Sequence, residues 1–231
     1  MLTLSVDTSS RVGSLAVLKD QAILGVVSTS SDEAYSARMF RQVEFLLAEL
    51  GIGLPAIDLY AVIAGPGSFT GLRVGLSAVK GWAEVYQRPI APVSGLEAVA
   101  SEAPVQAGLM ASILDARRGQ IYGALHSRSG GRIETRISDL VSAPEEFLTV
   151  LRESVSPSDV VFASPSPEIM HGALAGSVFA SCTLLRVSSV LAPAAGLLGI
   201  ERAARGEVVT ALELDANYVR RTDAEMHLKG T

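Results

Sequence analysis

The sequence of 231 residues has few of the residues that mark secreted, membrane or metal-binding proteins. Its single cysteine, Cys182, excludes an internal disulfide and favours a reducing compartment. The three histidines stand apart, so no cluster has the spacing of metal ligands. The longest apolar run, 191–200, is shorter than the roughly 20 residues that cross a membrane and contains Pro193. We therefore expect no metal site, no membrane span and a cytoplasmic location.

An excess of positive charge is also missing. The 19 basic residues are outnumbered by 24 acidic ones, which gives a net charge of −5 and an isoelectric point near 5.3. Because a protein that binds RNA by itself usually has a basic surface, we expect any contact with RNA to be indirect. Hydrophobic residues are abundant at 48%, which is enough for one large core or two smaller ones.

The order of predicted strands and helices is similar in the two halves of the chain. Each half begins with β-rich runs joined by tight turns and continues with alternating strands and helices, a pattern typical of mixed sheets covered by helices. The first half has expected strands at 2–6, 14–18, 22–28, 59–64 and 89–93, and helices at 32–50, 70–87 and from a capping box of Ser94 and Glu97 to 101. The second has expected strands at 110–115, 120–126, 132–137, 160–163 and 177–187, and helices from Ser142 and Glu145 to 152, at 167–175 and at 190–205. A linker at 104–108 would divide the chain into domains 1–104 and 105–231.

The most informative motif is the glycine-rich run from Gly65 to Arg73, which joins an apolar strand to a helix. Backbone N–H groups at a helix start attract anions, although the spacing matches neither the P-loop nor the dinucleotide-binding pattern. An acidic turn follows the first strand and would orient a metal-bound phosphate. The candidate nucleotide or phosphate residues are Asp7, Thr8, Ser9, Gly65, Gly67, Ser68 and Thr70. The alternatives, a closely packed turn at the loop and an Asx turn at Asp7, remain open.

The helix that follows the loop has a stripe of small residues, Gly71, Gly75 and Ala78, on one face. Glycine inside a helix costs about 1 kcal/mol relative to alanine, so two of them require a compensating close contact. Either the helix at 32–50 or another protein would supply it. Trp82, the only tryptophan, is either a core residue or an interface anchor.

Several segments, in order along the chain, resemble the bacterial TsaB (YeaZ) family. They are Asp7–Ser9 with Ser14–Leu18, Gly65–Leu76, Ser94–Ala98, Asp115–Tyr122 and Asn217–Arg221. The resemblance implies an α/β fold of the actin-like, sugar-kinase-like group (ASKHA, ribonuclease H-like) with two related domains. It also implies an accessory role in making threonylcarbamoyladenosine (t6A) in tRNA, in which a catalytic paralogue, TsaD, transfers threonylcarbamoyl from its adenylate to adenosine 37. The H-x-x-x-H motif of TsaD is absent here, so this chain is not expected to be an enzyme by itself.

The partners that the resemblance implies are TsaD in a heterodimer, the ATPase TsaE in a ternary complex, and a second copy when the chain is alone. No cofactor of its own is implied; ATP or ADP at the interface of the complex remains open. The helices at 32–50 and 70–87 would form the interface, with candidate residues Met39, Phe40, Val43, Gly71, Arg73, Gly75, Ala78 and Trp82.

One departure from the family pattern and one alternative function remain open. Family members commonly have a His-Ser-Glu-like run in the first long helix, where this chain has Tyr35-Ser36-Ala37-Arg38. The alternative function is an actin-like ATPase or phosphotransferase that acts alone, with Asp7 and the loop 65–71 around a metal-bound phosphate.

Overall fold

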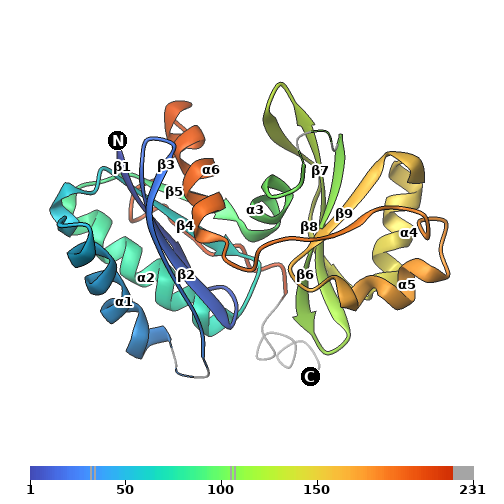
Figure 1. Cartoon of the computed structure of the whole chain (residues 1–231), viewed down its shortest axis with the longest axis horizontal. Coiled ribbons are helices and arrows are strands. Elements are labelled where there is room, and N and C mark those ends of the chain that lie inside the picture. Colours follow the sequence, from blue (N-terminus) through green and yellow to red (C-terminus); the bar gives the residue numbers. More distant parts are fainter. Residues whose placement is uncertain (32, 34, 105, 107, 221–231) are drawn as a thin grey trace, which may run out of the picture.

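The computed structural model describes residues 1–220 except 32, 34, 105 and 107, and it contains two five-stranded sheets side by side (Figure 1). The first half contains β1 (Leu2–Asp7), β2 (Val12–Lys19), β3 (Ala22–Ser30), α1 (Tyr35–Glu49), β4 (Leu59–Gly65), α2 (Phe69–Tyr86), β5 (Ile90–Ser94) and α3 (Gly95–Ser101). The second contains β6 (Leu109–Arg117), β7 (Gln120–Ser129), β8 (Arg132–Ser142), α4 (Pro144–Ser154), β9 (Val160–Ser164), α5 (His171–Ala175), β10 (Leu184–Arg186) and α6 (Ala192–Ala204).

The two sheets have the same topology. The first has the order β3-β2-β1-β4-β5 and the second has the order β10-β9-β6-β7-β8. In each sheet the first three strands along the chain pair antiparallel in sequence. The fourth strand pairs parallel with the first, and the fifth pairs parallel with the fourth. The predicted meander followed by α/β units is therefore confirmed in both halves.

Helices cover both sheets. The helices α1 and α2 lie on one face of the first sheet, and α6 returns from the end of the chain to cover the other face (Figure 1). The helix α3 packs between α6 and the second sheet, while α4 and α5 cover the outer face of that sheet. The division into domains 1–104 and 105–231 stays a prediction. The helix α6 belongs to the second range along the chain, but it packs on the first sheet.

Burial explains why these residues form these strands. All seven residues of β4 are buried, as expected of a central strand with helices on both faces. The large apolar residues of α1 and α2 that face this sheet, Leu46, Leu47, Leu72, Leu76 and Val79, form one core with β1 and β4. Among the described residues, no helix is both long and apolar enough to span a bilayer.

Two expected capping boxes differ from the structure. At α3, Ser94 Oγ accepts a hydrogen bond from the Leu96 N–H as expected, but the Glu97 carboxylate binds Arg202 instead of closing the box. At α4, the N-cap is Ala143, and its N–H donates to Glu146 Oε2 at 3.1 Å. The pair Ser142 and Glu145 was thus one residue too early, because Pro144 occupies the first helical position.

Two other expectations change at the element ends, and a third is only partly covered by the described residues. The strand expected at 177–187 is limited to Leu184–Arg186, because the preceding residues form turns held by Ser177 and Leu174. The helix expected from Asp32 begins at Tyr35, and Asp32 itself lies outside the described residues. The linker at 104–108 also lies partly outside them, at 105 and 107.

Candidate functional site

The glycine-rich loop packs directly on the turn that follows β1. The Ser68 N–H donates to the Ser9 carbonyl oxygen at 2.7 Å, and a Cβ atom at Gly67 would lie 2.5 Å from that same oxygen. The Thr8 hydroxyl donates to the Gly71 carbonyl oxygen at 2.7 Å. The structure therefore brings together five predicted residues, but their polar atoms largely bind one another.

Asp7 lies at the carboxyl end of β1, two residues before Ser9, with 1% of its surface exposed. Its Oδ1 accepts hydrogen bonds from the Ser9 N–H (2.8 Å) and hydroxyl (2.7 Å), which is the expected Asx turn. Its Oδ2 is buried without a hydrogen-bond partner. Burial raises the pKa of Asp7 to about 6, although the two bonds from Ser9 act in the opposite direction.

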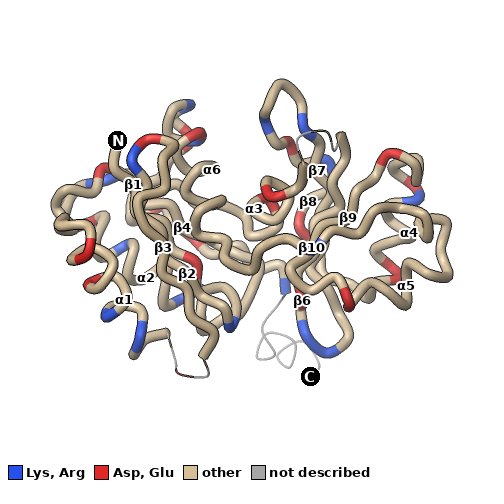
Figure 2. The backbone as a smooth tube through the Cα atoms, viewed as in Figure 1, with Lys and Arg blue, Asp and Glu red and all other residues tan. Residues whose placement is uncertain are grey.

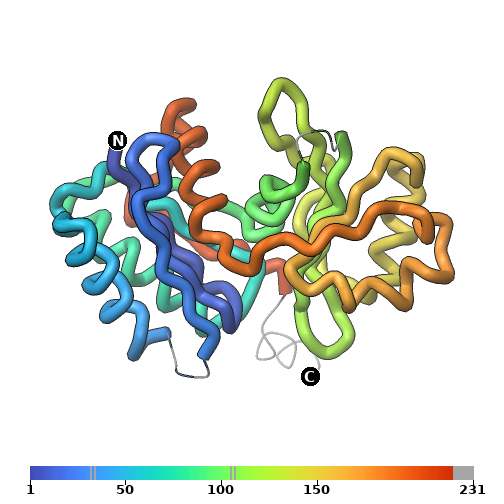
Figure 3. Tube along the Cα trace, in the orientation of Figure 1, coloured from blue at the N-terminus to red at the C-terminus, as the bar shows by residue number. Residues whose placement is uncertain are grey.

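The segment after α6 covers the start of the loop. The Asn217 N–H donates to the Ala64 carbonyl oxygen at 2.8 Å. Gly65 has a φ of +136°, and a Cβ atom there would overlap the Asn217 carbonyl oxygen. Glycine at this position is thus explained by a close approach of the chain to itself. In Figure 3 the red segment after α6 runs along the first half of the chain toward the second sheet.

The small residues of α2 have a different neighbour from the one expected. Gly71 and Gly75 are buried, and a Cβ atom at either would overlap Thr8: its carbonyl oxygen at Gly71 and its hydroxyl at Gly75. The compensating contact is therefore the turn after β1, not the helix α1 or another protein. That Gly71 and Gly75 lie in a partner interface stays a prediction. The need for a compensating contact no longer supports it, because Thr8 already supplies that contact.

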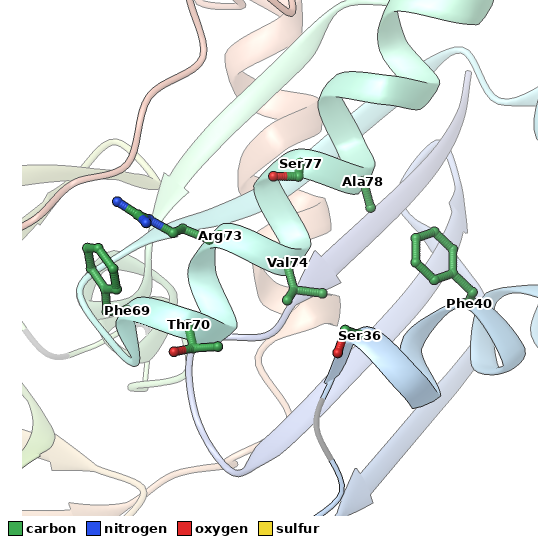
Figure 4. Close-up of a pocket in the computed structure, with 8 residues that line it drawn as sticks. All are labelled: Ser36, Phe40, Phe69, Thr70, Arg73, Val74, Ser77 and Ala78. Atoms are coloured by element: carbon green, nitrogen blue, oxygen red, sulfur yellow. The ribbon is translucent and has the colours of Figure 1, made fainter.

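A groove of about 510 Å³ lies between α1 and α2 (Figure 4). Val74 and Ala78 of α2 point across it toward Ser36 and Phe40 of α1. Its lining residues are Ser36, Phe40, Phe69, Thr70, Arg73, Val74, Ser77 and Ala78. Among the described residues, the lining is therefore apolar and hydroxylic, and Arg73 is the one charged side chain.

Two aromatic residues close one end of the groove region. Phe40 is 52% exposed and meets Trp82 edge to face, with 6.1 Å between the ring centroids. Trp82 is half-buried and also contacts the buried Tyr60. The tryptophan is therefore part of the edge of the core and at the same time supports an exposed phenylalanine.

Two of the predicted interface residues face the core instead. Met39 is 1% exposed and Val43 is 4% exposed, and both pack with residues of β1 and β2. Both residues lie on the buried face of α1 together with Leu46 and Leu47, so their side chains pack in the core with the sheet. Met39 and Val43 are therefore corrected from interface residues to core residues.

Arg73 is held at the other end of the groove. Its guanidinium lies 3.8 Å from the centroid of the Phe69 ring, and its Nε donates to the Tyr218 hydroxyl at 3.2 Å. The rings of Phe69 and Tyr218 are 5.0 Å apart. A cation on a short stack of aromatic rings is thus fixed in place by the segment that follows α6.

The unusual run at the start of α1 has a structural role in this chain. The Tyr35 hydroxyl donates to the Ser10 carbonyl oxygen at 2.6 Å. Arg38 is 3% exposed, lies 4.0 Å from the Tyr35 ring centroid and donates to Thr29 Oγ1 at 2.6 Å. These two side chains fasten α1 to β3 and to the turn after β1, beside the groove.

Sequence reasoning missed several residues of this region. Ser36, Val74 and Ser77 line the groove, and their spacing of four residues from Phe40, Thr70 and Arg73, respectively, could have indicated a shared face. Tyr218 is separated from Arg73 by 145 residues, so no local pattern could have paired them.

The remaining titratable candidates have structural environments. His126 is 1% exposed, its Nδ1 lies 2.9 Å from Ser112 Oγ, and burial lowers its pKa to about 4. Cys182 is half-buried, with its thiol 2.9 Å from the Pro157 carbonyl oxygen, and burial raises its pKa. Within the described part of the chain, no three His, Cys, Asp or Glu side chains are placed to hold a metal ion.

Comparisons with known proteins agree with this architecture. The structure of YeaZ from Pseudomonas aeruginosa is 28% identical, covers 94% of this chain and 99% of its own, and superposes with a TM-score of 0.73. A ROK family protein from Streptococcus pneumoniae, at 11% identity, covers 89% of this chain and 100% of its own with a TM-score of 0.50. The two repeated sheets define an actin-like (ASKHA) fold.

The family follows from sequence comparison. Residues 14–184 match the model of TsaD, tRNA N6-adenosine threonylcarbamoyltransferase. The tRNA threonylcarbamoyladenosine biosynthesis protein TsaB of Bacillus subtilis is 31% identical over 157 residues, which are 68% of this chain and 69% of that protein. The chain belongs to the TsaB (YeaZ) family, which takes part in t6A modification of tRNA.

Proposed function

We propose that this chain is a non-catalytic subunit of the t6A machinery that binds TsaD through the groove between α1 and α2. The single observation that carries the proposal is the groove itself, an apolar surface with the half-exposed Phe40 on one wall. Exposed aromatic side chains next to an apolar hollow are typical anchors of protein interfaces.

The chemistry of the polar residues supports a binding role. Asp7 is buried, and the glycines of the loop are in contact with Ser9 and Asn217. In the proposed complex, this chain binds TsaD, which carries out the transfer, while TsaE joins the same complex and tRNA contacts it through TsaD. Any ATP or ADP of the complex lies at its interface. Acidic and basic side chains are interspersed over both halves (Figure 2), which suits a subunit that leaves the RNA to its partner.

The test is co-elution of the purified chain with the TsaD of the same organism, with and without ATP. Ser77→Arg places a long charged side chain in the groove and should abolish co-elution, because Ser77 is exposed on the groove wall. Thr149→Arg on α4 is the matched control, since it adds the same charge to an exposed helical position in the other half. Absence of a wild-type complex, or a complex that both variants retain, would contradict the proposal.

An ATPase that acts alone is the second candidate, because Asp7 Oδ2 has no hydrogen-bond partner and could bind a cation. Magnesium-dependent ATP turnover by the pure chain, lost in Asp7→Asn, would establish that activity. Turnover at the background rate in both proteins would exclude it.

A further inference from the structure

Residues 216–220 form a strap that contacts both halves of the chain (Figure 1). On the first half, the Asn217 N–H donates to a carbonyl oxygen of β4 at 2.8 Å. On the second half, the Asn217 side chain donates to Asp139 Oδ2 of β8 at 2.8 Å. Arg220 donates to the Ala116 carbonyl oxygen, near the end of β6, at 2.9 Å. The strap therefore ties the two sheets to each other.

The strap is held mainly by exposed polar contacts. Its five residues, which all belong to the described part of the chain, form neither helix nor strand. Asn217 and Tyr218 are exposed, whereas Leu214, just before the strap, is 1% exposed and packs in the core of the first half. A segment with few buried apolar contacts and with solvent-exposed hydrogen bonds opens at a low cost in free energy. Leu214 is therefore a fixed point from which the strap can open.

Arg73 connects the strap to the groove between α1 and α2. Its side chain lines the groove, but its Nε donates to the Tyr218 hydroxyl at 3.2 Å. Its guanidinium lies 3.8 Å from the centroid of the Phe69 ring. Figure 4 shows the Arg73 side chain pointing toward Phe69 and away from Phe40 on the opposite wall. The charged group of the groove is thus turned toward the strap.

A carboxylate at the groove would compete with Tyr218 for this guanidinium. Arginine binds a carboxylate through two parallel charge-assisted hydrogen bonds, which are stronger than one bond to a neutral hydroxyl. The bond to Tyr218 is single and exposed, and Tyr218 itself is 41% exposed, so water can replace Arg73 at the hydroxyl. Charge complementarity with Arg73 therefore favours a partner that presents an acidic side chain at this end of the groove.

We propose that an acidic side chain of the protein bound in the groove draws Arg73 away from Tyr218 and thereby loosens the strap. The proposal rests on the proposed function, in which the bound protein is TsaD. Loosening the strap uncovers the loop at Gly65, which Asn217 covers in this structure, and releases β8 from its contact with the first half. Occupation of the groove is thus coupled to the way in which the two halves are held, and by reciprocity a looser strap favours occupation.

Calorimetric titration of TsaD into Tyr218→Phe tests the competition. The substitution keeps the ring and removes only the hydroxyl that holds Arg73. Affinity for TsaD should rise roughly two- to tenfold, because the free chain loses one hydrogen bond that binding must break. Tyr86→Phe is the matched control, since it removes a hydroxyl from the other end of α2, and it should bind as the wild type does.

A double variant isolates the role of the guanidinium. In the Arg73→Gln background no guanidinium remains to be shared, so adding Tyr218→Phe should leave the affinity unchanged. A tyrosine that merely positions Arg73 for TsaD would give the opposite result in the single variant, because its loss would weaken binding. Unchanged or lower affinity in Tyr218→Phe would therefore overturn the proposal, as would an equal gain in both backgrounds.

Amide hydrogen exchange of the wild-type chain separates this proposal from the proposed function. Addition of TsaD should slow exchange over 35–49 and 69–86, the two helices of the groove, and speed it in peptides that contain Asn217, whose N–H is bonded in the free chain. Slower exchange in the helices without faster exchange at Asn217 would overturn the coupling and leave the proposed function standing. Unchanged exchange in the helices would overturn both.

Discussion

Single residues in this chain are explained by long-range contacts. Gly71 and Gly75 look like a surface stripe in the sequence, yet both are buried against Thr8, a residue more than 60 positions away. Asp7 accepts the bonds of an Asx turn, which is one of the two roles expected for it, and its role toward a phosphate stays a prediction. The contact of the glycines with Thr8 was not predicted, because it joins residues far apart in the sequence.

The packing of Thr8 against α2 predicts opposite effects for two alanine substitutions in the same helix. Gly71→Ala should lower the free energy of unfolding by about 1–3 kcal/mol, because the new Cβ atom overlaps a backbone oxygen that cannot rotate away. Gly81→Ala should raise it by about 1 kcal/mol, because Gly81 is exposed with open space around it. Denaturant unfolding measures both; equal effects would contradict the packing described here.

The raised pKa of Asp7 predicts a pH dependence of stability. The folded chain holds this proton up to about pH 6, whereas the unfolded carboxyl titrates near 3.8. The contribution of Asp7 to the free energy of unfolding therefore falls as the pH rises from about 4 to 6 and is constant above. Subtracting the profile of Asp7→Asn, which stays neutral, should reveal a fall of up to about 3 kcal/mol. Parallel profiles would show that the carboxylate is not buried in this way.

At the scale of elements, most of the fold could be predicted because periodicity and turns are local signals. The helix expected at 70–87 is Phe69–Tyr86, and the buried strand expected at 59–64 is Leu59–Gly65. The strand expected at 177–187 was wrong over most of its length, since an apolar run can also form turns that pack on a core. The return of α6 to the first sheet was not predicted, because the spatial partner of a helix is not encoded in its own pattern.

The junction of α3 and α6 depends on an ion pair between Glu97 and Arg202. Their side chains are 12% and 24% exposed, and burial raises the pKa of Glu97 while Arg202 opposes that rise. Arg202→Ala should lower the free energy of unfolding by about 2–4 kcal/mol because it leaves Glu97 without its counter-charge. Adding Glu97→Gln should recover part of the loss.

The neighbouring Arg205 is the control for this prediction. It pairs with Glu207 at the surface, with 31% and 51% of the two side chains exposed. Arg205→Ala should change stability by less than about 1 kcal/mol. A loss as large as that of Arg202→Ala would mean that charge on α6, and not the junction with α3, determines the effect.

At the scale of the whole molecule, the first half of one actin-like chain carries the groove between α1 and α2. This groove combines an apolar wall with Arg73. The segment after α6 supports the groove through Tyr218 and reaches the second sheet through Arg220, which donates to the Ala116 carbonyl oxygen at 2.9 Å. The two halves are thus tied together beside the proposed binding surface.

Calorimetric titration of two α1 variants with TsaD tests the central claim most directly. Phe40 and Phe45 are exposed to a similar extent, 52% and 58%, but they lie on different flanks of the same helix. Phe40→Ala should weaken binding by about 2 kcal/mol, the loss expected for an aromatic anchor, while Phe45→Ala should bind TsaD as the wild type does. Wild-type affinity in Phe40→Ala, or an equal loss in both variants, would contradict the assignment of the groove as the TsaD-binding surface.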